Sequence, residues 1–120
     1  MGTIAIRGAT TVEENNSKSI ISNTIELLKE IERKNNLDKE KVISILFSST
    51  RDLNKEYPAK AARVIGYKNA ALMCFNEMEV LDNLKKCIRV MVLYDSSIGQ
   101  NSVKHVYLKE AKNLRPDLNK

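Results

Sequence analysis

The chain has 120 residues, of which 42% are hydrophobic and 29% charged, and its formal net charge is +5. This composition fits a single globular domain over residues 1–120 and excludes a disordered or fibrous chain. No apolar run approaches the ~20 residues of a membrane-spanning helix, and the N-terminus lacks the pattern of a signal peptide. We therefore expect a cytoplasmic protein without a membrane partner.

The first half of the chain predicts a strand, a long helix and a second strand. Alternating apolar residues indicate a first strand that ends near Gly8. Asn15 or Asn16 suits the cap of the following helix, and Asn35–Asn36 tolerate the left-handed turn that ends it. Residues 42–50, "VISILFSST", then predict a strand that is apolar on both faces. The apolar stripe predicted for the helix consists of Ile20, Ile21, Ile25, Leu28 and Ile31.

The second half predicts a short helix and three further strands. Pro58 begins a helix that continues to Gly66. Strands are expected at "NAALMCF", "CIRVMVLYD" and "HVYL", and the polar tail that follows should be irregular. The fold class is therefore α+β, with five strands, one long helix and one short helix. One long helix covers only one face of such a sheet, so self-association is the economical way to cover the other.

Arg89 is the one charged residue in the apolar run from Cys87 to Leu93. Strand alternation places it on the same face as Cys87 and Met91, in a strand that reads as buried on both faces. A guanidinium keeps its charge at any ordinary pH, and burying it without an anion would cost several kcal/mol. Either Arg89 pairs with Glu77 inside the fold, or it binds an anionic ligand.

Other cationic residues occupy positions where water would solvate their charges poorly. They favour the second alternative, an anionic ligand. Arg7 lies near the end of the first strand, Arg63 follows Lys60 on the short helix, and Arg115 is held by the proline after it. Arginines offer planar, forked donors to carboxylates, so this set predicts a pocket for a small polyanion. Scattered lysines and few aromatic residues do not indicate nucleic-acid binding, whose signature would be salt-dependent retention of DNA.

No pattern in the sequence indicates a metal, a cofactor or a catalytic nucleophile. Cys74 and Cys87 lie in apolar strands without metal-ligand spacing, which suggests reduced thiols in a reducing compartment. In such a strand Cys74 is interpreted as a packing or hydrogen-bonding group rather than a nucleophile. His105 is the only histidine and lacks the partners of a triad, so we interpret it as structural.

Five blocks of sequence follow one another in the order of a known family. They are "IRGATTVE" at 6–13, "YPAKAAR" at 57–63, "CFNEMEV" at 74–80, "LKKCIRVMV" at 84–92 and "HVYLKEAKNLRPDL" at 105–118. Together they closely resemble the AroH-type, monofunctional chorismate mutases. The resemblance covers nearly the whole chain, although in the long helix only the pattern agrees.

The resemblance implies a mixed sheet packed against a long helix. It also implies a homotrimer that forms a pseudo α/β barrel, with active sites in the clefts between subunits. The implied reaction converts chorismate to prephenate on the route to phenylalanine and tyrosine. This Claisen rearrangement is intramolecular and needs no nucleophile, base, metal or cofactor. An enzyme accelerates it by holding the reactive conformation and by stabilising charge on the breaking ether oxygen.

The resemblance also assigns residues to roles. Arg89 would contact the ether oxygen and a carboxylate, and Glu77 would accept a hydrogen bond from the ring hydroxyl. Arg7 and Tyr107 would bind carboxylate. The other implied substrate-binding residues are Met73, Cys74, Phe75 and Asn76 of the third strand, Tyr57, Ala59, Lys60 and Arg63 from the neighbouring subunit, and Leu114 and Arg115 of a mobile tail, from about residue 110, that closes over the site.

Three positions depart from the family pattern. Tyr57, Met73 and Gly99 stand where Phe, Thr and Pro are common, and Met73 removes a hydroxyl beside the site. The alternative function is a non-catalytic trimeric module of the same fold that senses an anionic metabolite. Intact Arg89 and Glu77 argue against such a degenerate site, and an assay of chorismate loss separates the two because a sensor binds without turnover.

Overall fold

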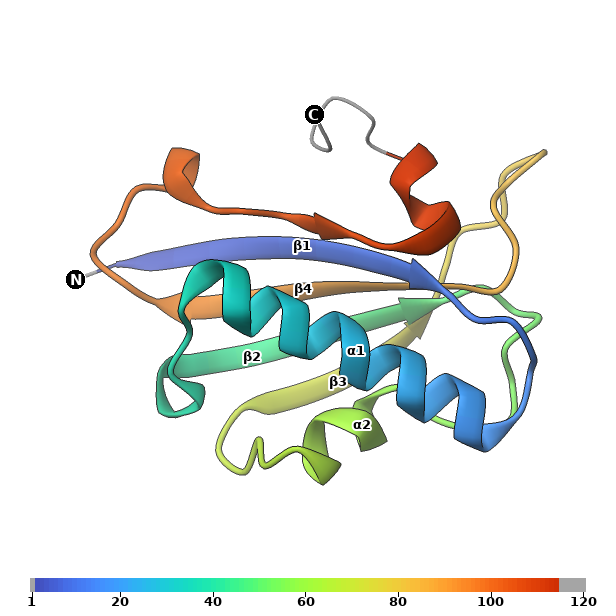
Figure 1. The fold of residues 1–120 in the computed structure, drawn as a ribbon, viewed down its shortest axis with the longest axis horizontal. Helices are drawn as coiled ribbons and strands as arrows, with labels where there is room; N and C mark the ends of the chain where they lie inside the picture. The colour runs from blue at the N-terminus through green and yellow to red at the C-terminus, as the bar shows by residue number, and fades with distance from the viewer. Residues whose placement is uncertain (1, 115–120) are drawn as a thin grey trace.

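A computed structural model describes residues 2–114, and its centre is a five-stranded sheet in the order β3-β2-β4-β1-β5 (Figure 1). The strands are β1 (Thr3–Thr11), β2 (Val42–Ser49), β3 (Ala71–Asn76), β4 (Cys87–Asp95) and β5 (Val106–Tyr107). The helices are α1 (Ser17–Asn35) and α2 (Ala59–Val64), with the short 3-10 helices η1 (Lys39–Lys41), η2 (Gln100–Ser102) and η3 (Lys109–Asn113). The expected five strands, one long helix and one short helix are confirmed.

The sheet is mixed, as the resemblance implied. The central strand β4 pairs antiparallel with β1 and β2, while β5 joins β1 and β3 joins β2 in parallel. Several bounds differ from the sequence prediction: β1 continues past Gly8 to Thr11, β5 is confined to Val106–Tyr107, β3 covers Ala71–Asn76, and α2 ends at Val64. Arg7 therefore lies in the middle of β1, opposite Met91, and not near the end of a strand.

The helix α1 crosses one face of the sheet and is capped as the sequence predicted (Figure 1). The side chain of Asn16 accepts a hydrogen bond from the backbone N–H of Ser19 at 2.8 Å, which satisfies one of the free donors of the first turn. At the other end Asn36 adopts φ 52°, the left-handed conformation that ends many helices.

The buried stripe of α1 differs from the predicted one. Ile21 and Ile25 are only half-buried, whereas Thr24 is fully buried and donates its hydroxyl to the carbonyl of Ile20 at 2.7 Å. This local hydrogen bond satisfies the hydroxyl, so a polar residue is tolerated in the core. The buried residues of α1 are Ile20, Asn23, Thr24, Leu27, Leu28 and Ile31.

Gly8 allows α1 to approach β1 closely. A Cβ at this position would lie 2.8 Å from Cδ1 of Ile31 and 3.0 Å from the carbonyl oxygen of Val106. Only a residue without a side chain fits beneath this turn of the helix. Gly8 is thus a packing position inside a strand rather than the end of one.

The two faces of the sheet differ in burial. On the face beneath α1 and α2, which we term the covered face, alternate residues such as Ile6, Ile45 and Val92 are buried. On the opposite, open face, Met73 and Phe75 are 56% and 47% exposed. The prediction that the strand of Arg89 is buried on both faces therefore fails for a single chain, because α1 and α2 lie on the other side and η3 covers the open face only around Ala9 and Cys87.

The segment after β5 is more regular than expected. Residues 109–113 form η3, because Ala111 is buried in a small cluster with Ala9, Cys87 and Tyr107, against which Leu114 packs. The expected mobility of the tail stays a prediction. Its proposed lid residue Arg115 lies outside the described residues.

Candidate active site

Strand pairing aligns the candidate residues on the open face. Arg89 of β4 is opposite Ala9 of β1, and Ala9 is opposite Tyr107 of β5. Two residues further along β4, Met91 is opposite Arg7. Residues that pair directly point to the same face of a sheet. Arg7, Arg89 and Tyr107 therefore all project from the open face.

These three residues line one cavity of about 200 Å³. The other lining residues are Gly8, Leu46, Phe47, Val90 and Met91, contributed by β1, β2 and β4. Two guanidinium groups and a phenol thus share a space that is otherwise walled by apolar side chains and backbone. Such donors can bind a small molecule that carries carboxylates.

Glu77 follows β3, and its carboxylate reaches Arg89. Ser48 donates its hydroxyl to Oε1 of Glu77 at 2.5 Å, and in the sheet Ser48 is paired with Arg89. The distance from Oε2 of Glu77 to Nε of Arg89 is 3.6 Å, which is an ion pair but too long for a hydrogen bond. Among the described residues, the buried Nε of Arg89 has no hydrogen-bond partner. Arg89 thus pairs with Glu77 and still has a donor left for a ligand.

Side chains from the segment before β5 pair with the backbone of β1 around Arg7. The amide of Gln100 accepts from the N–H of Ala5 at 2.8 Å and donates to its carbonyl at 2.6 Å. Nδ1 of His105 accepts from the backbone N–H of Arg7 at 2.9 Å. These contacts satisfy the edge of β1 where β5 does not extend. The structural role predicted for His105 agrees with this contact.

Cys87 lies on the same face as Arg89 and is 2% exposed. Burial raises the pKa of its thiol to about 11, although the neighbouring Arg89 guanidinium lowers it. The thiol therefore stays protonated near neutral pH, and a protonated thiol is a poor nucleophile. Both cysteines are free, as the sequence predicted.

The other candidates gather at the opposite edge of the sheet, beside β3 and α2. Tyr57, Cys74 and Asn76 line a second cavity of about 410 Å³. Burial raises the pKa of the Cys74 thiol, while a hydrogen bond from the Ala59 backbone and the charge of Arg63 lower it. Ala59 and Arg63 are therefore both close to Cys74.

The two cavities are distinct within one chain, because they share none of their lining residues. Among the described residues, none of α2 lines the cavity of Arg7 and Arg89. Tyr57 is 69% exposed, and Nζ of Lys60 lies 3.4 Å from Oε1 of Glu56. The residues assigned to a neighbouring subunit thus do not meet the arginine cavity of their own chain.

Alternation along β3 divides the candidates of that strand between the two faces. Met73 pairs with Leu46 and points, with Phe75, to the open face, whereas Cys74 pairs with Phe47 on the covered face. Cys74 and Met73 therefore cannot contact the same ligand from the same side of the sheet.

Sequence reasoning missed several residues of the site. Leu46 and Phe47 line the arginine cavity, and Ser48 holds Glu77. A serine at an alternate position of the apolar run "ILFSS" was a usable signal for Ser48. The contribution of Leu46 and Phe47 depends on strand register, which one sequence does not specify.

Within residues 2–114, no group of three or more His, Cys, Asp or Glu side chains is arranged to hold a metal ion. Over the same residues, none of the helices combines the length and the apolar character that a bilayer crossing requires.

The comparisons with known proteins identify the family of this chain. A family model described as chorismate mutase type I matches residues 3–118. Chorismate mutase AroH of Bacillus subtilis is 43% identical over 114 residues, covering 94% of this chain and 90% of the relative. Chorismate mutase AroH of Thermus thermophilus is 41% identical over 114 residues, covering 94% and 93%. A solved chorismate mutase from Clostridium thermocellum superposes with a TM-score of 0.89 at 48% identity, covering 91% of this chain and 97% of that one.

The mixed sheet with its long helix is an α+β fold, and its arginine-lined cavity suits a small anionic ligand. The chain belongs to the chorismate mutase type I family. Its function is accordingly that of a chorismate mutase.

Proposed function

We propose that the cavity of Arg7, Arg89 and Tyr107 converts chorismate to prephenate in the biosynthesis of phenylalanine and tyrosine. The observation that carries this proposal is the meeting of two guanidinium groups, Arg7 and Arg89, in one cavity, where Nε of Arg89 has no hydrogen-bond partner among the described residues. A dicarboxylate would supply anionic partners for the two guanidinium groups beyond the ion pair with Glu77. The ion pair with Glu77 alone leaves that donor unsatisfied, at a cost in free energy.

The chemistry needs few groups. One C–O bond breaks and one C–C bond forms within the same molecule, so no proton or electron enters or leaves. Arg7 and Tyr107 bind the carboxylates of the substrate, while the closed cavity as a whole holds its reactive conformation. Arg89 donates to the ether oxygen as its negative charge grows in the transition state. Glu77, fixed by Ser48, accepts a hydrogen bond from the ring hydroxyl.

We propose further that the active site is completed in a homotrimer. The arginine cavity of about 200 Å³ is smaller than the roughly 300–1,000 Å³ typical of ligand sites, so a further wall is needed. The exposed apolar residues of the open face favour burial by another copy. In this arrangement Tyr57, Ala59, Lys60 and Arg63 of the next subunit supply the missing wall, with Cys74, Phe75 and Asn76 beside them. Leu114 and Arg115 close over the substrate.

We place the protein in the cytoplasm, where a reducing environment keeps free thiols such as Cys74 and Cys87 unpaired.

The first test is loss of chorismate and gain of prephenate with purified protein, with and without EDTA. We expect turnover that a chelator leaves unchanged. Saturable binding of chorismate without turnover would support the sensor instead.

Mixing two inactive variants tests the shared site. Arg89→Ala removes one side of the site and Arg63→Ala the other. Reassembled from an equal mixture, about a quarter of the interfaces pair two intact sides, so about a quarter of the activity should return. Sites built within one chain would give no recovery beyond the two unmixed variants.

A further inference from the structure

Lys109 occupies an unusual backbone conformation directly after β5. It is the first residue of η3, and its φ is 55°. Residues other than glycine rarely adopt positive φ, because the Cβ then crowds the carbonyl oxygen. Glycine would adopt it freely. A lysine in such a position indicates that its side chain makes interactions which offset this cost.

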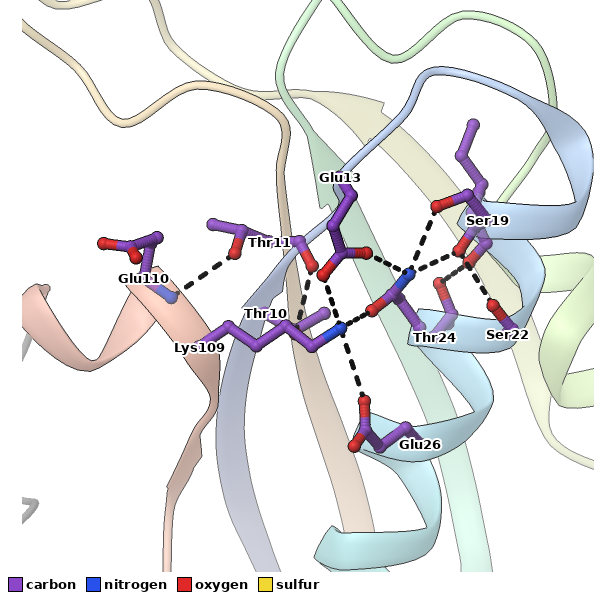
Figure 2. A network of polar contacts seen from close by, with 11 residues as sticks. Thr10, Thr11, Glu13, Ser19, Ser22, Thr24, Glu26, Lys109 and Glu110 are labelled. Atoms are coloured by element: carbon purple, nitrogen blue, oxygen red, sulfur yellow. Dashed lines mark hydrogen bonds and ion pairs between the residues drawn. The ribbon is translucent and has the colours of Figure 1, made fainter.

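The ammonium group of Lys109 has three anionic or polar partners (Figure 2). Nζ lies 2.9 Å from Oε2 of Glu13 and 3.7 Å from Oε1 of Glu26, and it donates to Oδ1 of Asn23. Glu13 lies between β1 and α1, whereas Asn23 and Glu26 belong to α1. The side chain therefore ties the end of β5 to two other parts of the fold.

The partners of Lys109 are themselves fixed. Asn23 is 4% exposed, and its amide donates to the carbonyl of Ser19 at 2.8 Å and to Oε1 of Glu13 at 3.3 Å. The hydrogen bond from Lys109 lowers the pKa of the Glu13 carboxyl, so the pair stays ionised near neutral pH. The ammonium is thus held by groups that are already positioned by α1.

The segment that this contact holds includes Tyr107. β5 has only two residues, so few strand hydrogen bonds fix Tyr107. The chain beyond it is attached by the N–H of Leu108 to the carbonyl of Ala9, at 2.9 Å, and by the N–H of Glu110 to the hydroxyl of Thr11, at 3.3 Å. Lys109 lies between these two attachments and adds ion pairs to Glu13 and Glu26.

We propose that Lys109 is a positioning residue for substrate binding: anchored by Glu13, Asn23 and Glu26, it fixes where Tyr107 and η3 stand beside the arginine cavity. This inference rests on the proposed role of Tyr107 in binding carboxylate. Lys109 itself does not line the cavity, so it acts through Tyr107. Because a carboxylate contact is equal in the ground state and the transition state, its loss raises KM and leaves kcat unchanged.

Steady-state kinetics of two variants tests the proposal. Lys109→Met removes the ammonium, and Lys109→Gly removes it while relieving the backbone strain. We expect both to raise KM by about 3- to 10-fold with kcat within about twofold of the parent enzyme. Lys109→Arg keeps the charge and should restore most of the affinity. Lys29→Met, the same change on the exposed side of α1, is the matched control and should alter neither constant.

A double-mutant cycle separates positioning from simple loss of stability. Once Lys109→Met is present, Glu13→Gln should raise KM no further, because the contact is already absent. Glu13→Gln and Glu26→Gln alone remain informative if Lys109→Met does not fold.

Tyr107→Phe shows whether the anchoring role of Lys109 or the carboxylate-binding role of Tyr107 is wrong. If it raises KM but Lys109→Met does not, the anchor is wrong. If Tyr107→Phe leaves KM unchanged, the assigned role of Tyr107 fails and the proposal falls with it. A fall in melting temperature with normal KM would make Lys109 merely structural and overturn the proposal.

Discussion

The two faces of the sheet are built from the same strands but have different composition and exposure. Beneath α1 and α2, alternate residues of β1, β2 and β4 are aliphatic and buried. On the open face, the intervening positions of the same strands hold Arg7, Ser48 and Arg89 beside half-exposed apolar residues. One face therefore stabilises the chain, and the other carries the polar groups that we propose bind the substrate. This division predicts that substitutions on the two faces act on different measured quantities.

The largest effect is expected on the open face, at Arg89. Arg89→Ala should lower kcat by on the order of 10³-fold or more, about 4 kcal/mol, because it removes charge stabilisation made in the transition state. Arg89→Lys loses the planar fork and should also be badly impaired. Turnover measured beside melting temperature separates these losses from unfolding. Arg51→Ala, an exposed arginine paired with Glu79 outside the cavity, is the control.

The competing view treats Arg89 as half of a structural ion pair with Glu77. It expects Arg89→Ala to unfold the protein and the double variant with Glu77→Gln to regain stability. A folded Arg89→Ala protein with near-normal turnover would refute the proposed mechanism.

A charge placed on the apolar part of the open face should prevent assembly. Met73→Glu would bury an unpaired carboxylate between subunits, at a cost of about 3 to 4 kcal/mol. Sedimentation velocity should show a smaller species than the parent protein, with activity reduced in parallel. Lys29→Glu adds a carboxylate to the outside of α1 and should leave assembly intact. An active trimer of Met73→Glu would mean that the open face is covered in another way.

On the covered face, truncation of a core residue should reduce stability and spare chemistry. Ile45 is fully buried, so Ile45→Ala should lower the free energy of unfolding by about 3 kcal/mol. The protein that remains folded should keep its KM. Chemical denaturation followed by kinetics at a low temperature measures both. A change in KM without loss of stability would contradict the separation of the two faces.

The smallest effect concerns alkaline pH and also belongs to the covered side. Burial, and then a hydrogen bond to the Glu32 carboxylate, raise the pKa of Tyr67 above its usual value. The neutral phenol is favoured in the folded state, so stability is fully present below pH ~10 and falls as the pH rises further, by at most about 1.4 kcal/mol per pH unit. Tyr67→Phe should flatten this fall in denaturation curves between pH 9 and 11. An unchanged slope would show that other groups cause it.

Local chemistry made much of the fold predictable. The helix ends were predicted at Asn15 or Asn16 and at Asn35–Asn36, because cap preferences act within a few residues, and the structure has the caps at Asn16 and Asn36. The strands were recognised from runs of apolar residues. The end of β1 was misplaced, because Gly8 was interpreted as a stop although it accommodates the packing of Ile31.

Features that depend on residues distant in the sequence were harder to predict. The buried stripe of α1 includes Leu27 and not Ile25, because the position of the helix on the sheet selects the face. The meeting of Arg89 and Glu77 was anticipated as one alternative, but the support from Ser48 arises only from strand register. The proposed roles at the site came from the family resemblance, and residue pattern alone predicted no more than a polyanion pocket.

The antiparallel pairing of β1 with β4 also has consequences during synthesis. The first strand of the chain pairs along its whole length with residues near the other end, from Thr3 opposite Asp95 to Thr11 opposite Cys87. A growing chain cannot form this pairing until β4 has left the ribosome, and contacts of such long sequence separation slow folding. Until then the apolar strands β1 and β2 lack their central neighbour and are open to aggregation. The strand that carries Arg89 is thus also the one whose arrival allows the newly made chain to close its sheet.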